Sequence, residues 1–351
     1  MSAPSESTGS VSPGSTGRVS LTGIKPSGEP HLGNLLGAIR PALRLAEEYD
    51  SMYFIADYHA LTSIRDPELK RHYTRSVAAT WMAAGLDPER TTFYLQSDVP
   101  ETFELTWIMS CVTGKGLMNR AHAYKAARDR NVEAGEEPDA GINMGLYNYP
   151  VLMAVDILIM ETDVVPVGKD QVQHVEYAAD IAGSFNHLYG DHYTFKIPRA
   201  IVPEGPAETL PGLDGRKMSK SYDNTIPLFL PENKLKKLVR RIPTDSTPVE
   251  DPKDPDGAAV FQILEQVAPA SAADVVADTR KRLEAGGMGW GEVKNVLFEV
   301  LNTELAPMRE RYDALMEPGS ELDDALARGA ERARARAGRV LSAARRAVGI
   351  S

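Results

Sequence analysis

Two closely spaced lysines are the side chains in this sequence best suited to phosphate chemistry. Lys217 and Lys220 lie in the string Lys-Met-Ser-Lys-Ser, which follows Gly215 after one residue. The glycine predicts a mobile loop. Cations on such a loop can close over a triphosphate and stabilise charge that develops as a bond breaks. The alternative is a basic loop that only contacts solvent, as most short lysine-rich segments do.

A second candidate phosphate site follows the first apolar run of the chain. Residues 23–34 read Gly-Ile-Lys-Pro-Ser-Gly-Glu-Pro-His-Leu-Gly-Asn and open a helical stretch. A glycine-bearing turn from strand to helix presents free N–H groups and the positive end of the helix, which favours a phosphate chain. His31 and Asn34 add donors for charge on phosphate oxygens. Taken alone, such a turn is equally typical of a tight connection.

Three side chains suited to an aromatic ligand share one face of a predicted helix. Tyr149, Met153 and Asp156 are spaced at i, i+4 and i+7, so they project from the same side. A carboxylate can accept a hydrogen bond from an indole N–H, which is only ever a donor, while Met153 packs on the ring. The alternative is a core-packed helix with Asp156 at its solvent edge. Together with the two phosphate segments, the face favours a pocket for an indole.

The two phosphate segments resemble a pair of known signatures. Residues 30–34 (Pro-His-Leu-Gly-Asn) resemble the HIGH signature, and residues 217–221 match the KMSKS signature, of class I aminoacyl-tRNA synthetases. Blocks at residues 57–62, 149–158 and 165–174 resemble tryptophanyl-tRNA synthetases of the bacterial type. With the C-terminal helices, the resemblance covers nearly all of the chain after the first 17 residues.

The resemblance implies an enzyme that activates L-tryptophan with ATP to tryptophanyl-adenylate and transfers it to the 3′ end of tRNA(Trp). It implies Mg²⁺ on the ATP phosphates without a dedicated protein cage, so we expect no metal site. It also implies a homodimer, with no DNA partner. A tyrosyl-tRNA synthetase, which shares the fold, is the nearest alternative. A paralogue that binds the amino acid without charging tRNA is the second alternative.

The resemblance also assigns site residues. Catalysis is expected from His31, Asn34, Lys217, Ser219 and Lys220. ATP is expected to contact Lys25, Pro26, Ser27, Gly33, Asn34, Gly168, Asp170, Lys217, Met218, Ser219 and Lys220. Tryptophan is expected to contact Gly23, His59, Tyr149, Met153, Asp156 and Gln171, with Tyr149 and Gln171 holding its α-amino group. Taken alone, His59 is more typical of a structural histidine.

Two positions depart from the family pattern. Lys25 stands where many bacterial members have glutamine, a form similar to auxiliary enzymes that are less sensitive to the tryptophan mimic indolmycin. Ala127 stands where an active-site lysine usually follows an aromatic-lysine pair. Lys25, Lys125 and Arg128 are the candidates to supply the missing phosphate contact.

The elements that must position these residues alternate between short apolar runs and longer helical stretches. β-type runs cover residues 19–24, 52–56, 92–95 and 164–167, and the last of them precedes a helical stretch at residues 170–189. This order predicts βαβ units and an α/β fold with a Rossmann-like, doubly wound parallel sheet. Such sheets bind ligands at the carboxyl ends of their strands.

The predicted organisation has three parts. Residues 1–17 are rich in Ser, Thr, Gly, Pro and Ala, which predicts a disordered tail. Residues 18–227 form the catalytic domain with a connective insertion. Residues 228–351 lose the β-type signal and predict an appended all-helical domain for tRNA and anticodon binding, broken near residues 243–257 and 286–291.

Composition excludes several classes of protein. The chain has 351 residues, a formal net charge of −10 and one cysteine, Cys111. A single cysteine excludes an internal disulfide framework and, with no signal segment at the start, favours a reducing, cytoplasmic compartment. No apolar run approaches the roughly 20 residues that span a bilayer, so we expect no membrane partner. The negative charge argues against non-specific coating of nucleic acid.

Two basic runs in the helical part are candidates for contact with tRNA. The first contains Lys234, Lys236, Lys237, Arg240 and Arg241, and the second contains Arg332, Arg334, Arg336, Arg339, Arg345 and Arg346. Solvated helix faces are an equally good interpretation of each run.

Overall fold

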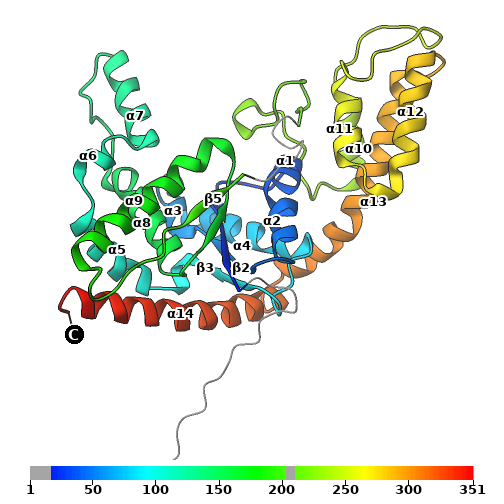
Figure 1. Ribbon diagram of the computed structural model, residues 1–351. Coiled ribbons are helices and arrows are strands. Elements are labelled where there is room, and N and C mark those ends of the chain that lie inside the picture. The colour runs from blue at the N-terminus through cyan, green and yellow to red at the C-terminus, as the bar shows by residue number, and fades with distance from the viewer. Residues whose placement is uncertain (1–16, 203–209, 351) are drawn as a thin grey trace, which may run out of the picture.

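Five parallel strands form the centre of the molecule. The computed structural model describes residues 17–202 and 210–350, and Figure 1 shows their arrangement. The strands are β1 (Val19–Ile24), β2 (Asp50–Ile55), β3 (Thr92–Leu95), β4 (Val164–Pro166) and β5 (Arg199–Ile201), in the order β3-β2-β1-β4-β5. The sheet confirms the predicted α/β fold. β5 is not among the predicted strands, because its Arg-Ala-Ile sequence begins with an exposed arginine and gives no apolar run.

The sheet is built outward from β1 in both directions. β1 pairs with β2 on one side and with β4 on the other, and β3 and β5 form the two edges. A reversal of this kind opens a crevice at the carboxyl ends of the central strands, which is where open α/β sheets bind ligands. The segments that follow β1, β2 and β4 at this edge carry ten of the eighteen predicted site residues.

Helices cover both faces of the sheet. They are α1 (Leu32–Asn34), η1 (Leu35–Ile39), α2 (Arg40–Leu45), α3 (Asp57–Ala60), α4 (Pro67–Ala83), η2 (Gln96–Asp98), α5 (Glu101–Val112), α6 (Lys115–Met118), α7 (His122–Glu133), α8 (Met144–Leu158), η3 (Lys169–Gln171) and α9 (Val172–Tyr189). Tyr53 and Ile55 of β2 join one apolar cluster, whereas Met52 and Phe54 join the other. Because neighbouring residues of a strand point to opposite faces, both faces of β2 are buried.

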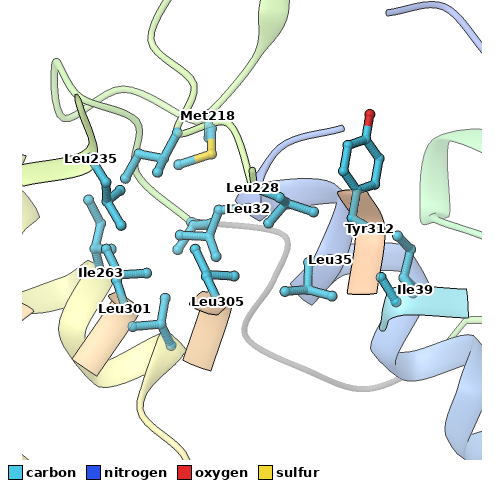
Figure 2. Packing of buried hydrophobic residues seen from close by; sticks show 14 of the residues in the cluster. Leu32, Leu35, Ile39, Met218, Leu228, Leu235, Ile263, Leu301, Leu305 and Tyr312 are labelled. Atoms are coloured by element: carbon cyan, nitrogen blue, oxygen red, sulfur yellow. The ribbon is translucent and has the colours of Figure 1, made fainter. Parts of the chain in front are cut away.

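The helical part, on the right of Figure 1, shares its core with the sheet domain. It contains α10 (Glu232–Arg240), α11 (Ala259–Val267), η6 (Ala270–Ala272), α12 (Ala273–Ala285) and α13 (Trp290–Met316). Leu301 and Leu305 of α13 lie in the same buried cluster as Leu32 and Met218, as Figure 2 shows. Apolar packing therefore fixes both candidate phosphate segments against the helical part.

The last helix, α14 (Glu321–Ala347), leaves the helical part and runs along the sheet domain (Figure 1, red). Gly329 permits this close approach, since a Cβ at that position would lie 1.7 Å from the carbonyl oxygen of Phe93 in β3. Ala333 and Ala337 continue the narrow buried face. A larger side chain at Gly329 would push α14 away from the strand.

Arginines of α14 attach it to the sheet domain. Arg332 donates to the carbonyl oxygens of Pro88 and Thr91. The ion pairs join Arg334 to Glu101, Arg336 to Asp50 and Arg345 to Glu104. Much of the second basic run therefore binds other parts of the same molecule. Neither the tRNA-contact interpretation nor the solvated-face interpretation predicted these contacts.

The predicted domain boundary at residues 227 and 228 stays a prediction. α14 lies beyond that boundary, yet it packs on β3 and α5. Residues 1–16 of the expected tail lie outside the described residues. Within residues 17–202 and 210–350, no helix combines the length and the apolar content that a membrane crossing needs.

Candidate active site

The turn after β1 is joined by backbone hydrogen bonds to the segment that follows Lys217 and Lys220. His31 has an extended backbone (φ −131°) and caps α1. The Leu32 N–H donates to the Ile226 carbonyl at 2.9 Å, and the N–H of residue 228 donates to the carbonyl of residue 30 at 3.3 Å. The two predicted phosphate segments are therefore neighbours in space, although about 190 residues separate them in the sequence.

His31 is held in its neutral form. Burial, and secondly the charge of Lys220, lower the pKa of its imidazole to about 4. Its Nδ1 is buried and has no hydrogen-bond partner among the described residues. A neutral ring can donate to a phosphate oxygen from one tautomer without bringing a second charge. Asn34 fixes the backbone beside it, since its Oδ1 accepts the His31 N–H at 3.1 Å.

Gly33 allows the two segments to touch. A Cβ on Gly33 would lie 3.1 Å from the His31 ring and 3.6 Å from the sulfur of Met218. Met218 is buried with apolar residues of α1 and α13 (Figure 2) and so anchors the second segment. Lys217 and Lys220, on either side of Met218, stay exposed.

Asn224 holds the backbone of the lysine-bearing segment. Its Oδ1 accepts the Ser219 N–H at 2.8 Å, and its Nδ2 donates to Asp214 at 2.7 Å and to the Lys217 carbonyl at 3.1 Å. Ser219 in turn accepts the Ser221 N–H at 3.2 Å. Asn224 is not among the predicted site residues. A buried asparagine in a turn just after the motif is the signal that points to it.

Lys220 lies against the turn after β1. A Cβ on Gly28 would be 3.1 Å from the Lys220 ammonium nitrogen, and Gly28 has a φ of +143° that favours glycine. Burial lowers the pKa of Lys220, and the carboxylate of Glu29 opposes that effect. The expected catalytic residues His31, Asn34, Ser219 and Lys220 thus form one constellation around this turn.

At the carboxyl ends of β2 and β3, Asp156 of α8 is the centre of a buried hydrogen-bond network. Gln96 Nε2 donates to Oδ1 at 3.0 Å and to Oδ2 at 2.8 Å, and His59 Nε2 lies 3.0 Å from Oδ2. Burial raises the pKa of Asp156, and the contacts with His59 and Gln96 oppose that rise. Asp156 is only 4% exposed, so it is not at a solvent edge.

Gln96 is a residue of this network that the sequence prediction missed. It directly follows β3, at the edge of the sheet where ligands bind, and that position is the signal that could have identified it. Its Oε1 also accepts the Tyr58 N–H at 3.1 Å. Gln96 therefore joins α3, which carries His59, to α8, which carries Asp156.

The other predicted tryptophan contacts surround this network to different degrees. The Tyr149 ring lies 6.3 Å from the His59 ring and 6.1 Å from the His174 ring, both edge-on. Met153 is half-buried one turn further along α8. Gly23, the last but one residue of β1, pairs with Phe54, whose ring would be 2.4 Å from a Cβ on Gly23. A side chain at Gly23 would therefore displace this wall of the site.

The residues after β4 lie at the open side of the site. Gly168 precedes η3 and Gln171 is its last residue, and both are exposed. Asp170 belongs to η3, but its side chain lies outside the described part of the chain.

Known proteins resemble this chain over almost its whole length. A family model described as tRNA synthetases class I (W and Y) matches residues 18–306. The tryptophan–tRNA ligase of Pseudomonas aeruginosa is 55% identical over 94% of this chain and 73% of the relative. That of Neisseria meningitidis is 50% identical over 94% of this chain and 97% of the relative. The chain belongs to the class I tRNA synthetases of the tryptophan and tyrosine group.

A solved structure from this family gives the same picture. Tryptophanyl-tRNA synthetase from Campylobacter jejuni, complexed with ADP and tryptophan, superposes with a TM-score of 0.84 at 42% identity. The match covers 94% of this chain and 99% of that one. The parallel sheet and the C-terminal helices described above are therefore those of the family.

Lys25, the first departure from the family pattern, links the two ends of the site. Its ammonium donates to Thr62 Oγ1 at 2.9 Å, and that hydroxyl donates to the His59 carbonyl at 2.8 Å. Burial lowers the pKa of Lys25. Within the same turn, Pro26 is buried and Ser27 is exposed. Lys25 thus reaches from the phosphate turn to the helix that carries His59.

Ala127, the second departure, lies on the packed side of α7. It is buried, whereas Lys125 and Arg128 are exposed. Residues two positions before and one position after Ala127 point in other directions around a helix. In this conformation neither cation takes the place of a side chain at position 127, and Lys25 is the candidate that already contacts the site.

Proposed function

We propose that this chain is a tryptophan–tRNA ligase, which forms tryptophanyl-adenylate from ATP and L-tryptophan and then esterifies tRNA(Trp). The single observation that carries the proposal is the buried Asp156 carboxylate, held by Gln96 and by His59, whose backbone is joined through Thr62 to Lys25 of the first phosphate segment. The 55% identity to a tryptophan–tRNA ligase supports the same conclusion.

Asp156 accepts the indole N–H of the substrate. A carboxylate offers about four lone-pair sites, and Gln96 and His59 make three contacts with them. One acceptor position on Oδ1 is left for the indole N–H. A phenylalanine ring would leave that position unpaired in a buried site, and such a defect rejects analogues by large factors. Met153 packs against the ring, and Tyr149 and Gln171 hold the α-amino group.

The phosphate segments promote attack on ATP. A carboxylate oxygen of tryptophan bonds to the α-phosphorus, the bond to the bridging oxygen breaks, and pyrophosphate leaves with its Mg²⁺. Neutral His31 donates a hydrogen bond, and Lys217 and Lys220 stabilise the negative charge that moves onto pyrophosphate. No group of three or more His, Cys, Asp or Glu side chains within the described residues is arranged to hold a metal. The family resemblance is what supports Mg²⁺ on the ATP phosphates.

The second half-reaction uses the same site. A hydroxyl of the terminal ribose of tRNA attacks the carbonyl carbon of the adenylate, loses its proton, and displaces AMP. Lys234, Lys237 and Arg240 of α10 are exposed and are available to contact the tRNA. The first basic run therefore fits this role better than the second, whose arginines bind the sheet domain. Charging of tRNA for protein synthesis places the enzyme in the cytoplasm.

A second copy of the chain covers an exposed apolar face of α5. Phe103 is 42% exposed and Trp107 is 71% exposed. They lie one turn apart, and Cys111 continues the same face. An apolar face of this kind favours association, which supports the homodimer. Sedimentation equilibrium should give a dimer for the wild type and a monomer for Trp107→Lys, and a wild-type monomer at micromolar concentration would contradict the assignment.

Tryptophan-dependent exchange of pyrophosphate into ATP tests the first half-reaction. Exchange with tyrosine in place of tryptophan would identify a tyrosyl-tRNA synthetase. Exchange without charging of a tRNA(Trp) transcript would identify a paralogue that activates tryptophan but has lost aminoacylation. Charging with tryptophan alone is the expected result.

A further inference from the structure

Glu29 places a negative charge in the turn that is proposed to bind phosphate. Its carboxylate accepts hydrogen bonds from two residues of α4: His72 Nε2 donates to Oε1 at 2.5 Å, and Ser76 Oγ donates to Oε2 at 2.8 Å. A carboxylate next to a triphosphate site weakens ground-state binding of the anion. Both of its oxygens are nevertheless held in fixed positions, which suggests a use for the charge.

The hydrogen-bond chain extends to the helical part of the molecule. Tyr312 of α13 donates to Ser76 Oγ at 2.9 Å. Its ring stacks on Phe229 with 3.8 Å between ring centroids. Ser76 is fully buried and Tyr312 is 8% exposed. In Figure 2, Tyr312 stands beside Leu35 with its hydroxyl directed away from the apolar side chains. Donors therefore run in one direction, from Tyr312 through Ser76 to Glu29, and such chains strengthen each bond.

Lys220 is the cation that faces this carboxylate. Its ammonium nitrogen lies beside Gly28, the residue before Glu29. The Glu29 carboxylate favours the charged form of Lys220, because it raises a pKa that burial otherwise lowers. No hydrogen bond or ion pair joins these two described side chains, so Glu29 attracts the Lys220 ammonium without fixing its position.

We propose that Glu29 is a positioning residue for adenylate formation, which holds the Lys220 ammonium beside Gly28 until pyrophosphate takes it over. His72, Ser76 and Tyr312 hold the carboxylate in place for this task. The inference rests on the proposed ligase function, because it assigns Glu29 a role only in the step where charge moves onto pyrophosphate. The simpler alternative is that Glu29 merely braces the turn against α4.

A double-mutant cycle with Lys220→Ala distinguishes the positioning role of Glu29 from a purely structural brace. Glu29→Gln should lower kcat for pyrophosphate exchange about five- to tenfold, the effect of weakening one charge-assisted interaction. The KM for tryptophan should stay within about twofold of wild type. In the Lys220→Ala background, Glu29→Gln should change kcat less than about twofold, because the residue that it positions is absent. If Glu29 only braced the turn, Glu29→Gln would lower kcat by the same factor in the wild-type and Lys220→Ala backgrounds. That result would overturn the inference.

Tyr312→Phe tests the far end of the chain while keeping the ring that stacks on Phe229. It should lower kcat about threefold and lose this effect in the Glu29→Gln background. Tyr53→Phe is the matched control, since it removes another buried phenol hydrogen bond, to the Ala42 carbonyl at 2.8 Å, which is not part of the chain from Tyr312 to Glu29. The control should leave kcat within about 1.5-fold of wild type, and an equal loss in Tyr53→Phe would overturn the assignment of Tyr312.

Outcomes for the inference and for the ligase function are distinguishable. An active wild type whose kcat is unchanged by Glu29→Gln refutes the positioning role and leaves the ligase function standing. A wild type without tryptophan-dependent exchange refutes the ligase function, and the inference with it. Thermal melting of each variant shows whether the fold is intact, and a Glu29→Gln protein that is inactive because it unfolds would support the brace.

Discussion

The two ends of the site are built in opposite ways. At the tryptophan end, Asp156 is 4% exposed and its partners Gln96 and His59 come from elements fixed at the edge of the sheet. At the phosphate end, Lys217 and Lys220 are exposed, and backbone contacts hold the segment that carries them. Recognition thus relies on a polar network whose desolvation cost is met during folding. Catalysis relies on two lysines in more exposed positions, which make their full interactions only as charge moves onto pyrophosphate.

This difference predicts different kinetic signatures for the two ends. A network that is complete before the substrate binds discriminates in the ground state and in the transition state alike. Charges that engage as pyrophosphate departs affect mainly the transition state. Changes at the tryptophan end should therefore act on kcat/KM for the amino acid, and changes at the phosphate end should act on kcat.

Asp156→Asn should have the largest effect, about a hundredfold loss of kcat/KM for tryptophan in pyrophosphate exchange. Gln96 Nε2 donates to both carboxylate oxygens. An asparagine amide group must therefore face either that donor or the indole N–H, whichever way it is flipped. A change of less than threefold would refute the assigned role.

Asp163→Asn is the matched control for this change. Asp163 is also a carboxylate beside the sheet, where it accepts the Val19 N–H at 2.8 Å and pairs with Lys196. It lies at the start of β4, opposite the edge that carries the site. The control should keep kcat/KM for tryptophan within about twofold of wild type.

Lys220→Ala should lower kcat for adenylate formation about thirtyfold while the dissociation constant of ATP changes less than threefold. Burial already lowers the pKa of Lys220, but its ammonium nitrogen only lies beside the turn, so its full interaction is made as charge moves onto pyrophosphate. Lys237→Ala, an exposed lysine on α10, is the control and should leave this step unchanged. If pre-steady-state kinetics showed only weaker ATP binding, Lys220 would act on the ground state. The kinetic difference expected between the two ends of the site would then be refuted.

Features that depend on local sequence patterns could be predicted from the sequence, and features that depend on tertiary contacts could not. The apolar runs predicted β1 and β3 with their observed bounds. The π-helix η1 was not predicted, because the residues that shape it are packed against Tyr53 and Val77 of other elements. The docking of α14 was missed for the same reason. Arginines that looked solvated pair with acids about 230 to 290 residues away.

The site shows the same division. Local motifs predicted His31, Asn34, Lys217 and Lys220, and helix periodicity placed Asp156 on the face of Tyr149. Gln96, Asn224 and Glu29 were not predicted, because each acquires its role only from a partner distant in sequence or on the opposite side of a turn.

Lys25→Gln tests whether the two ends are independent. Lys25 is joined through Thr62 to the backbone of His59, so its charge lies between them. Natural substrates bring phosphate charge to this point, whereas a neutral indole mimic leaves the cation poorly paired. We expect the wild type to resist indolmycin and Lys25→Gln to lower the inhibition constant about tenfold.

The tryptophan KM should change less than twofold in Lys25→Gln, since Asp156 and its partners are untouched. Both proteins are compared at the same concentrations of tryptophan and Mg-ATP. An unchanged inhibition constant would show that Lys25 does not couple the two ends.

The smallest expected effect concerns His31, whose imidazole is buried at the phosphate end. Its folded pKa is about 4, below the ordinary value of 6.5. Between these values the unfolded chain binds more protons than the folded chain, so the free energy of unfolding must fall as the pH falls from 7 towards 4. We expect a loss of about 1 kcal/mol at pH 5, since solvent that reaches the site screens part of the shift.

His31→Gln removes this titration and should make the free energy of unfolding about 1 kcal/mol less dependent on pH between 7 and 5. Urea unfolding at both pH values, with wild type and variant measured together, cancels the contribution of other groups. Because Nδ1 has no partner among the described residues, a neutral amide loses no hydrogen bond of the free enzyme there. If the free energy of unfolding depended equally on pH in both proteins, His31 would be solvated in the free enzyme. The described residues of the phosphate end would then include no buried titratable side chain comparable to Asp156 at the tryptophan end.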